Sequence, residues 1–171
     1  MTPGFQPAWL RGPIADISPL LQPVAHALID ADEDVAKVVA GLSPMELAAT
    51  PCGAASVAFH VIHAIGSLDR LFTYARGRAL DETQLAALAG EKQLNAAALT
   101  GDALAARFSA AVRAAHAQLA STPDEELLQV RLVGRAQLPS TTLGLLVHGA
   151  EHTARHVGQI VTTARIIVAG R

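Results

Sequence analysis

Three histidines recur every four residues near the C-terminus: His148, His152 and His156. In an α-helix, a step of four residues turns by about 400°, so each side chain lies roughly 40° around the axis and one turn beyond the previous one. His152 and His156 therefore project from one face, with their imidazoles close enough to share a metal ion. Zinc-binding helices in other folds use the same spacing between two histidines.

A third ligand has to come from elsewhere in the chain, and the best source is His63. His60 lies three residues before it, so either imidazole could approach an ion on that side of a helix. Three histidines without a fourth protein ligand leave a coordination position open, as catalytic metal sites do and structural zinc sites do not. The spacing therefore predicts an open metal site and leaves the choice between His60 and His63 undecided.

Four long helices are expected to position these histidines. Four stretches of the sequence have the apolar periodicity of a helix, and each begins and ends at capping or helix-breaking residues. Short extra helices are expected in the connections, starting after Ser43, within residues 80–98 and after Thr122. Val130 to Pro139 is expected to be extended, without a strand pattern strong enough for a sheet. The predicted fold class is all-α, a four-helix bundle. Its long helices begin at Ser18-Pro19, about Ala54, Thr100 and Ser140, and end near Gly41, Arg76, Leu119 and Val168.

Residues 1–17 are dense in proline and glycine, which predicts an irregular lead-in, and residues 18–171 are expected to form a single domain. Trp9 lies in the lead-in. We expect this tryptophan to anchor the segment to the bundle by burial, with a lid over the site as the alternative.

Composition and charge exclude several classes of function. The net charge is −2 and the basic residues do not cluster, so we expect no nucleic-acid binding. No stretch of about twenty apolar residues is uninterrupted, so we expect no membrane span. The chain has one cysteine, which excludes an internal disulfide and is compatible with a reducing cytoplasm. We therefore expect a cytoplasmic location.

Two separate motifs resemble the DinB/YfiT superfamily of metal-binding four-helix bundles. They are Ser56-Val-Ala-Phe-His-Val-Ile-His63, followed by a similar stretch to Gly77, and Glu151-His-Thr-Ala-Arg-His-Val-Gly-Gln159. The resemblance extends from about Trp9 to Ile167. It implies a divalent ion such as zinc or nickel with His63, His152 and His156 as ligands, because the register from Ser56 favours His63 over His60.

Other polar residues of the two motifs are candidates to surround the ion or bind a substrate. A ligating imidazole usually donates its other N–H to an acceptor, which Glu151 or a backbone carbonyl could supply. Residues facing the same side could hold a substrate carboxylate or the polar parts of a thiol cofactor. The candidates around the ion are His60, His148, Glu151 and Gln159, and the candidates for substrate binding are Arg70, Tyr74 and Arg155.

The resemblance implies a metal-dependent enzyme acting on a small molecule. Family members include transferases and isomerases that use bacillithiol, mycothiol or glutathione, so the expected activity is thiol-dependent S-transfer to a small electrophile. The alternatives are a hydrolase using metal-bound water and a non-catalytic bundle that binds a metal or small ligand. The resemblance also implies a homodimer, for which the alanine-rich helices are suited.

Overall fold

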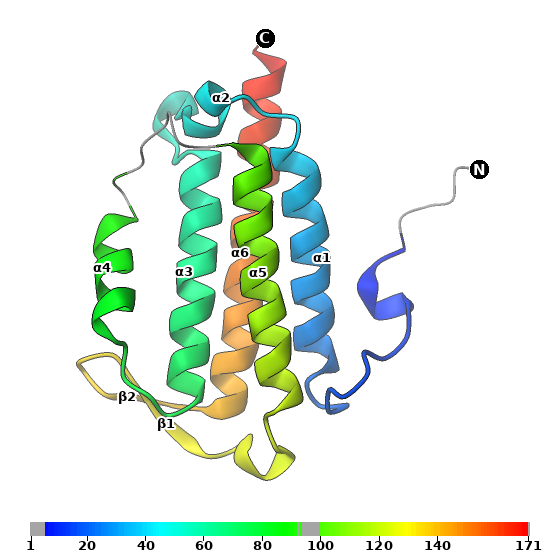
Figure 1. Ribbon diagram of the computed structural model, residues 1–171, viewed down its shortest axis with the longest axis vertical. Helices are drawn as coiled ribbons and strands as arrows, with labels where there is room; N and C mark the ends of the chain where they lie inside the picture. Colours follow the sequence, from blue (N-terminus) through cyan, green and yellow to red (C-terminus); the bar gives the residue numbers. More distant parts are fainter. Residues whose placement is uncertain (1–5, 92, 94–99, 171) are drawn as a thin grey trace.

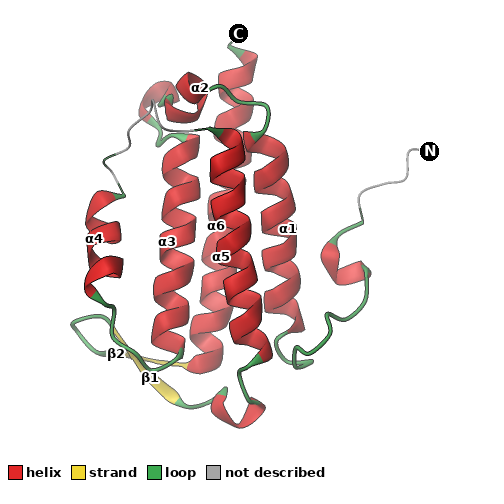
Figure 2. Cartoon of the chain, viewed as in Figure 1, coloured by secondary structure: helices red, strands yellow, loops and turns green. Residues whose placement is uncertain are grey.

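The computed structural model describes residues 6–91, 93 and 100–170 of the chain. Four long helices run side by side (Figure 1): α1 (Gln22–Val39), α3 (Val57–Ala75), α5 (Gly101–Ala120) and α6 (Thr142–Ala169). The predicted all-α bundle with short helices in its connections is confirmed. The shorter elements, visible in Figure 2, are η1 (Ala8–Leu10), α2 (Pro44–Ala48), η2 (Pro51–Gly53), α4 (Glu82–Gly90), η4 (Asp124–Glu126), β1 (Val130–Val133) and β2 (Leu138–Thr141).

Each long helix packs against two others. α3 contacts α6 and α5, and α1 also contacts α6 and α5, so the order around the bundle is α1–α6–α3–α5. The core residues between them include Leu28, Val61, Phe108, Leu146 and Ile160, all at most 1% exposed. Burial of each such side chain contributes roughly 1.5–3 kcal/mol. This core holds α3 against α6, which places two segments distant in sequence side by side.

Local capping sets where α3 begins and ends. The Ser56 side chain accepts a hydrogen bond from the backbone N–H of Phe59 at 3.2 Å, satisfying a donor that has no partner inside the helix. At the other end Gly77 adopts a φ of 69°, a left-handed conformation that glycine tolerates best. The predicted helix of about residues 54–76 is therefore close to the observed one.

The start of α6 differs from the prediction. Thr141, not Ser140, is the N-cap, and its hydroxyl accepts from the N–H of Gly144 at 3.0 Å. Ser140 instead belongs to β2, which pairs antiparallel with β1. The expectation of a connection without a sheet was wrong. Two four-residue strands carry too little periodicity to be recognised individually, and their pairing becomes visible only when the chain turns back at Gly134.

Two further helix starts were predicted wrongly. α1 begins at Gln22 rather than at Pro19, because the Gln22 side chain binds the backbone of Ile14 and holds the preceding segment in turns. The segment after Thr122 is the three-residue helix η4, with Pro123 rather than Thr122 at its N-cap. Thr122 instead donates from its hydroxyl to the Gln118 carbonyl at 2.7 Å, so it closes α5.

The lead-in packs along the side of α1, as Figure 1 shows. Its backbone is tied to α1 by a hydrogen bond from Ala8 N–H to Asp30 Oδ1 at 2.8 Å, and Ala8 itself is buried. Trp9 is 64% exposed, so the expectation that it anchors the segment by burial was wrong. The division of the chain at residues 17 and 18 stays a prediction.

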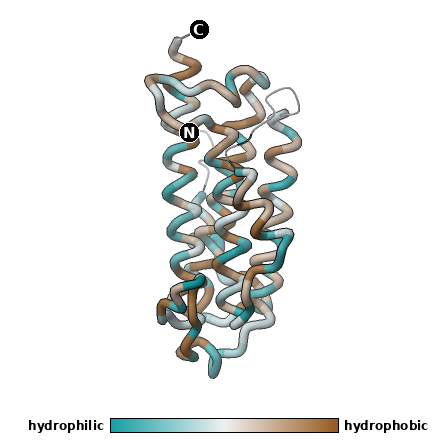
Figure 3. Tube along the Cα trace, turned by 90° about the vertical axis from the view of Figure 1, so that its left-hand side faces the viewer, coloured by the Kyte–Doolittle hydropathy of each residue, from teal (hydrophilic) through white to brown (hydrophobic). Residues whose placement is uncertain are grey.

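Apolar and polar residues alternate along the long helices (Figure 3), as expected when each helix buries one face. Within the described residues, no single helix has the length and apolar content to cross a membrane, although α2–η2 and α3, joined at a 95° bend, meet those criteria as a pair.

Candidate metal centre

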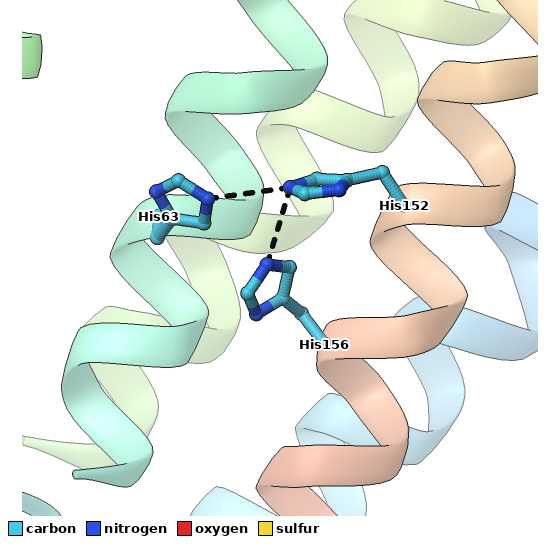
Figure 4. Close-up of side chains that lie close together, drawn as sticks. All are labelled: His63, His152 and His156. Carbon is cyan, nitrogen blue, oxygen red and sulfur yellow. Dashed lines mark hydrogen bonds between the residues drawn. The ribbon is translucent and has the colours of Figure 1, made fainter. Parts of the chain in front are cut away.

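Three of the predicted histidines meet between α3 and α6. His63 points from α3 toward α6, while His152 and His156 project from successive turns of α6 toward α3 (Figure 4). The close packing of α3 on α6 brings together residues that are 89 positions apart in the chain. The three side chains form the one cluster of potential metal ligands found in the described part of the chain.

All three imidazoles present the same ring nitrogen to the centre. His152 Nε2 lies 3.2 Å from His63 Nε2 and 3.1 Å from His156 Nε2. All three ligand atoms lie within 4.8 Å of one another. A tetrahedral zinc ion bound at about 2.0–2.1 Å holds neighbouring nitrogens about 3.3 Å apart. The two separations from His152 Nε2 therefore fit a shared ion, and the third nitrogen pair lies within 4.8 Å.

Partners on the outer side of two rings determine where the lone pairs point. His63 Nδ1 lies 2.7 Å from Glu91 Oε2, and a carboxylate only accepts hydrogen bonds, so neutral His63 carries its proton on Nδ1. His156 Nδ1 lies 3.1 Å from His60 Nδ1. When His156 donates in that contact, its Nε2 lone pair also faces the centre. The carboxylate thus selects the metal-binding tautomer of His63, and the contact with His60 is compatible with the same tautomer of His156.

Burial favours the neutral form of the two clustered histidines on α6. It lowers the pKa of His156 to about 4, and the neighbouring His152, His63 and His60 lower that pKa further through charge repulsion. Burial is also the main cause of the lowered pKa values of His60 and His152. Unprotonated imidazole is the form that binds a metal ion, so at neutral pH His152 and His156 are ready to bind without first losing a proton.

His60 lies behind the cluster rather than within it. His60 is only 7% exposed. Its Nδ1 contacts Nδ1 of His156, so it lies on the side of that ring that faces away from the cluster. The structure therefore separates the two histidines that spacing alone left equivalent: His63 lies with His152 and His156, and His60 supports His156.

Glu91 is the residue of this site that the sequence did not reveal. It is the C-cap of α4, is 6% exposed, and binds Arg70 Nη1 at 2.5 Å with the oxygen that does not face His63. It falls in a stretch expected to be a short helix and loop, of which residues 92 and 94–99 lie outside the described residues. The sequence offered one hint of this role, an acidic residue in a segment rich in alanine and leucine. Its partners could not be predicted, because they are on α3 and meet Glu91 only where α4 returns along that helix.

Glu151 does not have the orienting role that was expected. Its carboxylate binds His148 Nδ1 at 3.1 Å and Arg155 Nη2 at 2.7 Å on the exposed side of α6. These two hydrogen bonds hold the pKa of Glu151 below its usual range. The interpretation of Glu151 as an acceptor for a ligating imidazole was wrong, because one helical residue before His152 points about 100° away from it.

The remaining candidates lie at different distances from the histidines. The His148 ring is 5.8 Å from the His152 ring and is exposed to solvent. Tyr74 follows His63 by eleven residues, about 16 Å of helix rise, and is partly buried against the core, which places it outside the cluster. Gln159 is exposed on α6, and Arg70 approaches the site only through Glu91.

A groove of about 440 Å³ opens on the other side of Glu91, between α3, α4 and α5. Its walls are mostly apolar, and Arg107 is among the polar residues that line it. Glu91 thus contacts His63 on one side and lines the groove on the other. The histidines themselves do not line it. The apolar walls include Ile62, Ile65, Leu68, Phe72 and Ala111.

Comparisons with known proteins agree with this architecture. The family model of the DinB superfamily matches residues 27–160, a range that contains the three clustered histidines. A solved structure, titled as the conserved protein of a locus from Enterococcus faecalis, is similar in fold with a TM-score of 0.68 and 21% sequence identity. The alignment covers 87% of this chain and 97% of that chain. No curated protein matches the chain.

Proposed function

We propose that this chain, which belongs to the DinB superfamily, is a metal-dependent enzyme that transfers a small thiol to an electrophilic molecule. The observation that carries the proposal is the convergence of His63, His152 and His156 Nε2 atoms between α3 and α6. Neutral imidazoles suit zinc and nickel among the common divalent ions. The site would hold such an ion through these three nitrogens.

The chain leaves access to the centre. His63 keeps 24% of its side chain exposed, and His152 is partly exposed, whereas His156 is buried at the inner end. A divalent ion held there supplies a Lewis acid that lowers the pKa of a thiol or water and polarises a substrate oxygen. The three histidines hold and orient it, and the partly exposed rings leave an approach from solvent.

A thiol nucleophile suits the surroundings better than water does. Hydrolysis normally uses a positioned base to take a proton from water. Among the described residues, the carboxylate next to His152 in sequence is Glu151, which already binds Arg155 and His148 on the exposed side. The carboxylate of Glu91 binds His63 and Arg70. A thiol requires less help, because its ordinary pKa is much lower than that of water.

The family resemblance offers bacillithiol, mycothiol and glutathione as the candidate thiols. Of the cations proposed for binding its polar groups, Arg155 pairs with Glu151 at the exposed surface of α6, whereas Arg70 pairs with Glu91 in a mostly buried contact that is harder to give up. We therefore favour Arg155. A cytoplasmic location remains a proposal from the single cysteine, and a homodimer remains a proposal from the family resemblance.

The test is thiol-dependent turnover by metal-loaded protein. The protein is purified, its metal content measured, and zinc-loaded and nickel-loaded samples are assayed with each thiol and an electrophilic dye. We expect conjugation that requires both metal and thiol and disappears in His152→Ala. Metal binding without thiol-dependent or hydrolytic turnover would instead identify a non-catalytic metal-binding bundle. Equal metal content in wild type and in His63→Ala, His152→Ala and His156→Ala would overturn the site assignment.

A further inference from the structure

The segment that carries Glu91 is otherwise exposed. None of the residues of α4, Glu82–Gly90, is buried, yet the next residue is an acid that is 6% exposed. We call residues 82–91 the α4 arm. Burying a carboxylate is costly unless it is paired and hydrogen-bonded. An exposed helix that ends in a buried acid therefore points to a specific role for that acid.

Both carboxylate oxygens of Glu91 have partners on α3. Oε2 accepts from His63 Nδ1 at 2.7 Å, and Oε1 accepts from Arg70 Nη1 at 2.5 Å. The arm has a second polar attachment near its start, where Gln84 Nε2 donates to Asp69 Oδ2 at 2.6 Å. The arm is thus held to α3 at both ends, but only the Glu91 end contacts a clustered histidine.

Gly66 makes room for this arrangement. A Cβ atom at position 66 would lie 2.5 Å from Glu91 Oε1 and 2.7 Å from Arg70 Nη1. Both distances are far below an ordinary contact, so any larger residue would displace the ion pair. Gly90, in the arm itself, has nothing within 4 Å of the corresponding position. Of these two glycines, only Gly66 lies where an added side chain would meet the Glu91–Arg70 ion pair.

We propose that Glu91 is a positioning residue, which fixes His63 with its proton on Nδ1 and its Nε2 lone pair toward His152 and His156, and that the same contact docks the α4 arm. The part concerning metal rests on the function proposed above. Because one contact serves both purposes, metal binding and arm docking are linked, and each strengthens the other by the same factor.

The first test reads the His63 tautomer in metal-free protein by ¹⁵N NMR. We expect the Nδ1–H form in wild type and a shift toward the Nε2–H form in Glu91→Ala. Glu82→Ala, which removes an exposed acid from the first turn of the same helix, is the matched control and should leave the tautomer unchanged. An unchanged His63 tautomer in folded Glu91→Ala would overturn the proposal, whether or not the protein binds metal.

The second test measures zinc affinity by competition with a chelator. Loss of a partner behind a ligating histidine typically weakens metal binding by about 10–100-fold, and we expect this for Glu91→Ala. Gly66→Ala should have an effect in the same direction without removing any polar group, while Gly90→Ala should not. If wild type binds zinc through the three histidines but Glu91→Ala binds equally well, the role of Glu91 is refuted and the proposed function stands.

The third test concerns the arm. Zinc should slow hydrogen exchange of the amides of residues 82–91 in wild type and have no such effect in Glu91→Ala. Gln84→Ala loosens the other attachment without touching His63, so it should speed exchange in the arm and retain the zinc response. Equal exchange in the arm with and without bound zinc would contradict the linkage. A wild type that binds neither zinc nor nickel would refute the proposed function, and the tautomer measurement would still decide the role of Glu91.

Discussion

Two histidine–glutamate pairs lie at this site, and in both the glutamate also binds an arginine, but the pairs differ in sequence separation and in burial. His63 and Glu91 are 28 residues apart, lie 2.7 Å from each other, and expose 24% and 7% of their side chains. His148 and Glu151 are three residues apart on one helix, lie 3.1 Å from each other, and expose 50% and 58%. The first pair orients a ring that faces two other histidines. The second forms wherever a helix places such residues one turn apart.

The difference shows that proximity in sequence is a poor guide to which pair matters. A local pair can be recognised from its spacing, but exposure to water reduces what it contributes. The distant pair requires α4 to return along α3, and its burial makes the loss of either partner expensive. Four measurements test this contrast.

The largest difference should appear in metal binding. His63→Ala removes one of three ligand atoms, and we expect zinc affinity to fall by more than about 100-fold, beyond the effect typical of outer partners. His148→Ala removes an exposed ring that is 5.8 Å from the His152 ring and should change affinity little. Isothermal titration or chelator competition measures both. Comparable losses in the two variants would show that the site includes the exposed pair.

A large difference is also expected in the stability of metal-free protein. Glu91→Ala leaves Arg70, whose side chain is 11% exposed, without its carboxylate. Breaking a buried pair in this way costs roughly 3–5 kcal/mol, so we expect a loss near the lower end of that range. Glu151→Ala is the matched control on the exposed side and should give no resolvable change. Urea unfolding at pH 7 measures both variants, and equal stabilities would remove the distinction between the pairs.

The buried side of the site should also make stability depend on pH. The pKa of His156 is lowered to about 4 in the folded protein, against an ordinary value of about 6.5 in the unfolded chain. Between these values the unfolded state binds a proton that the folded state does not. Stability is therefore full above about pH 6.5 and falls by about 3 kcal/mol as the pH drops to about 4.

His60 and His152, whose pKa values are also lowered, act in the same direction. Urea unfolding of metal-free protein across this range gives the slope. His156→Asn should flatten it, and His148→Gln, which removes an exposed histidine, should not. A stability that is constant down to pH 4 would mean that the buried histidines are not neutral in the folded state.

The sequence was sufficient where the physical cause is local. Ser43 forms a capping box with Glu46, as their spacing predicted. The four-residue interval between His152 and His156 predicted that they share a face, and both do face α3. These features depend on hydrogen bonds and directions within one or two turns, so a short window of sequence contains the whole cause.

Features that depend on packing between distant segments were not predictable in the same way. Glu91 acquires partners only because α4 returns along α3, and Ser140 becomes a strand residue only because β1 lies opposite. Trp9 was expected to be buried because tryptophan usually is, but Ala8 beside it occupies the buried position. Choosing His63 over His60 required the family register. The role of these four side chains is determined by neighbours from elsewhere in the chain.

The smallest expected effect concerns the exposed pair itself. Hydrogen bonds from His148 and Arg155 hold the pKa of Glu151 below its usual range, so these contacts favour the folded state above that range and lose their effect as the pH falls through it. Raising the salt concentration from about 0.1 M to about 1 M shortens the screening length from about 10 Å to about 3 Å. The pKa of Glu151 should therefore rise toward its ordinary value.

Titration of its side-chain ¹³C signal at both salt concentrations measures this shift, with His148→Ala and Arg155→Ala each removing part of it. A titration insensitive to salt would mean that Glu151 is protected from solvent, and the contrast between the two pairs would then need a cause other than burial.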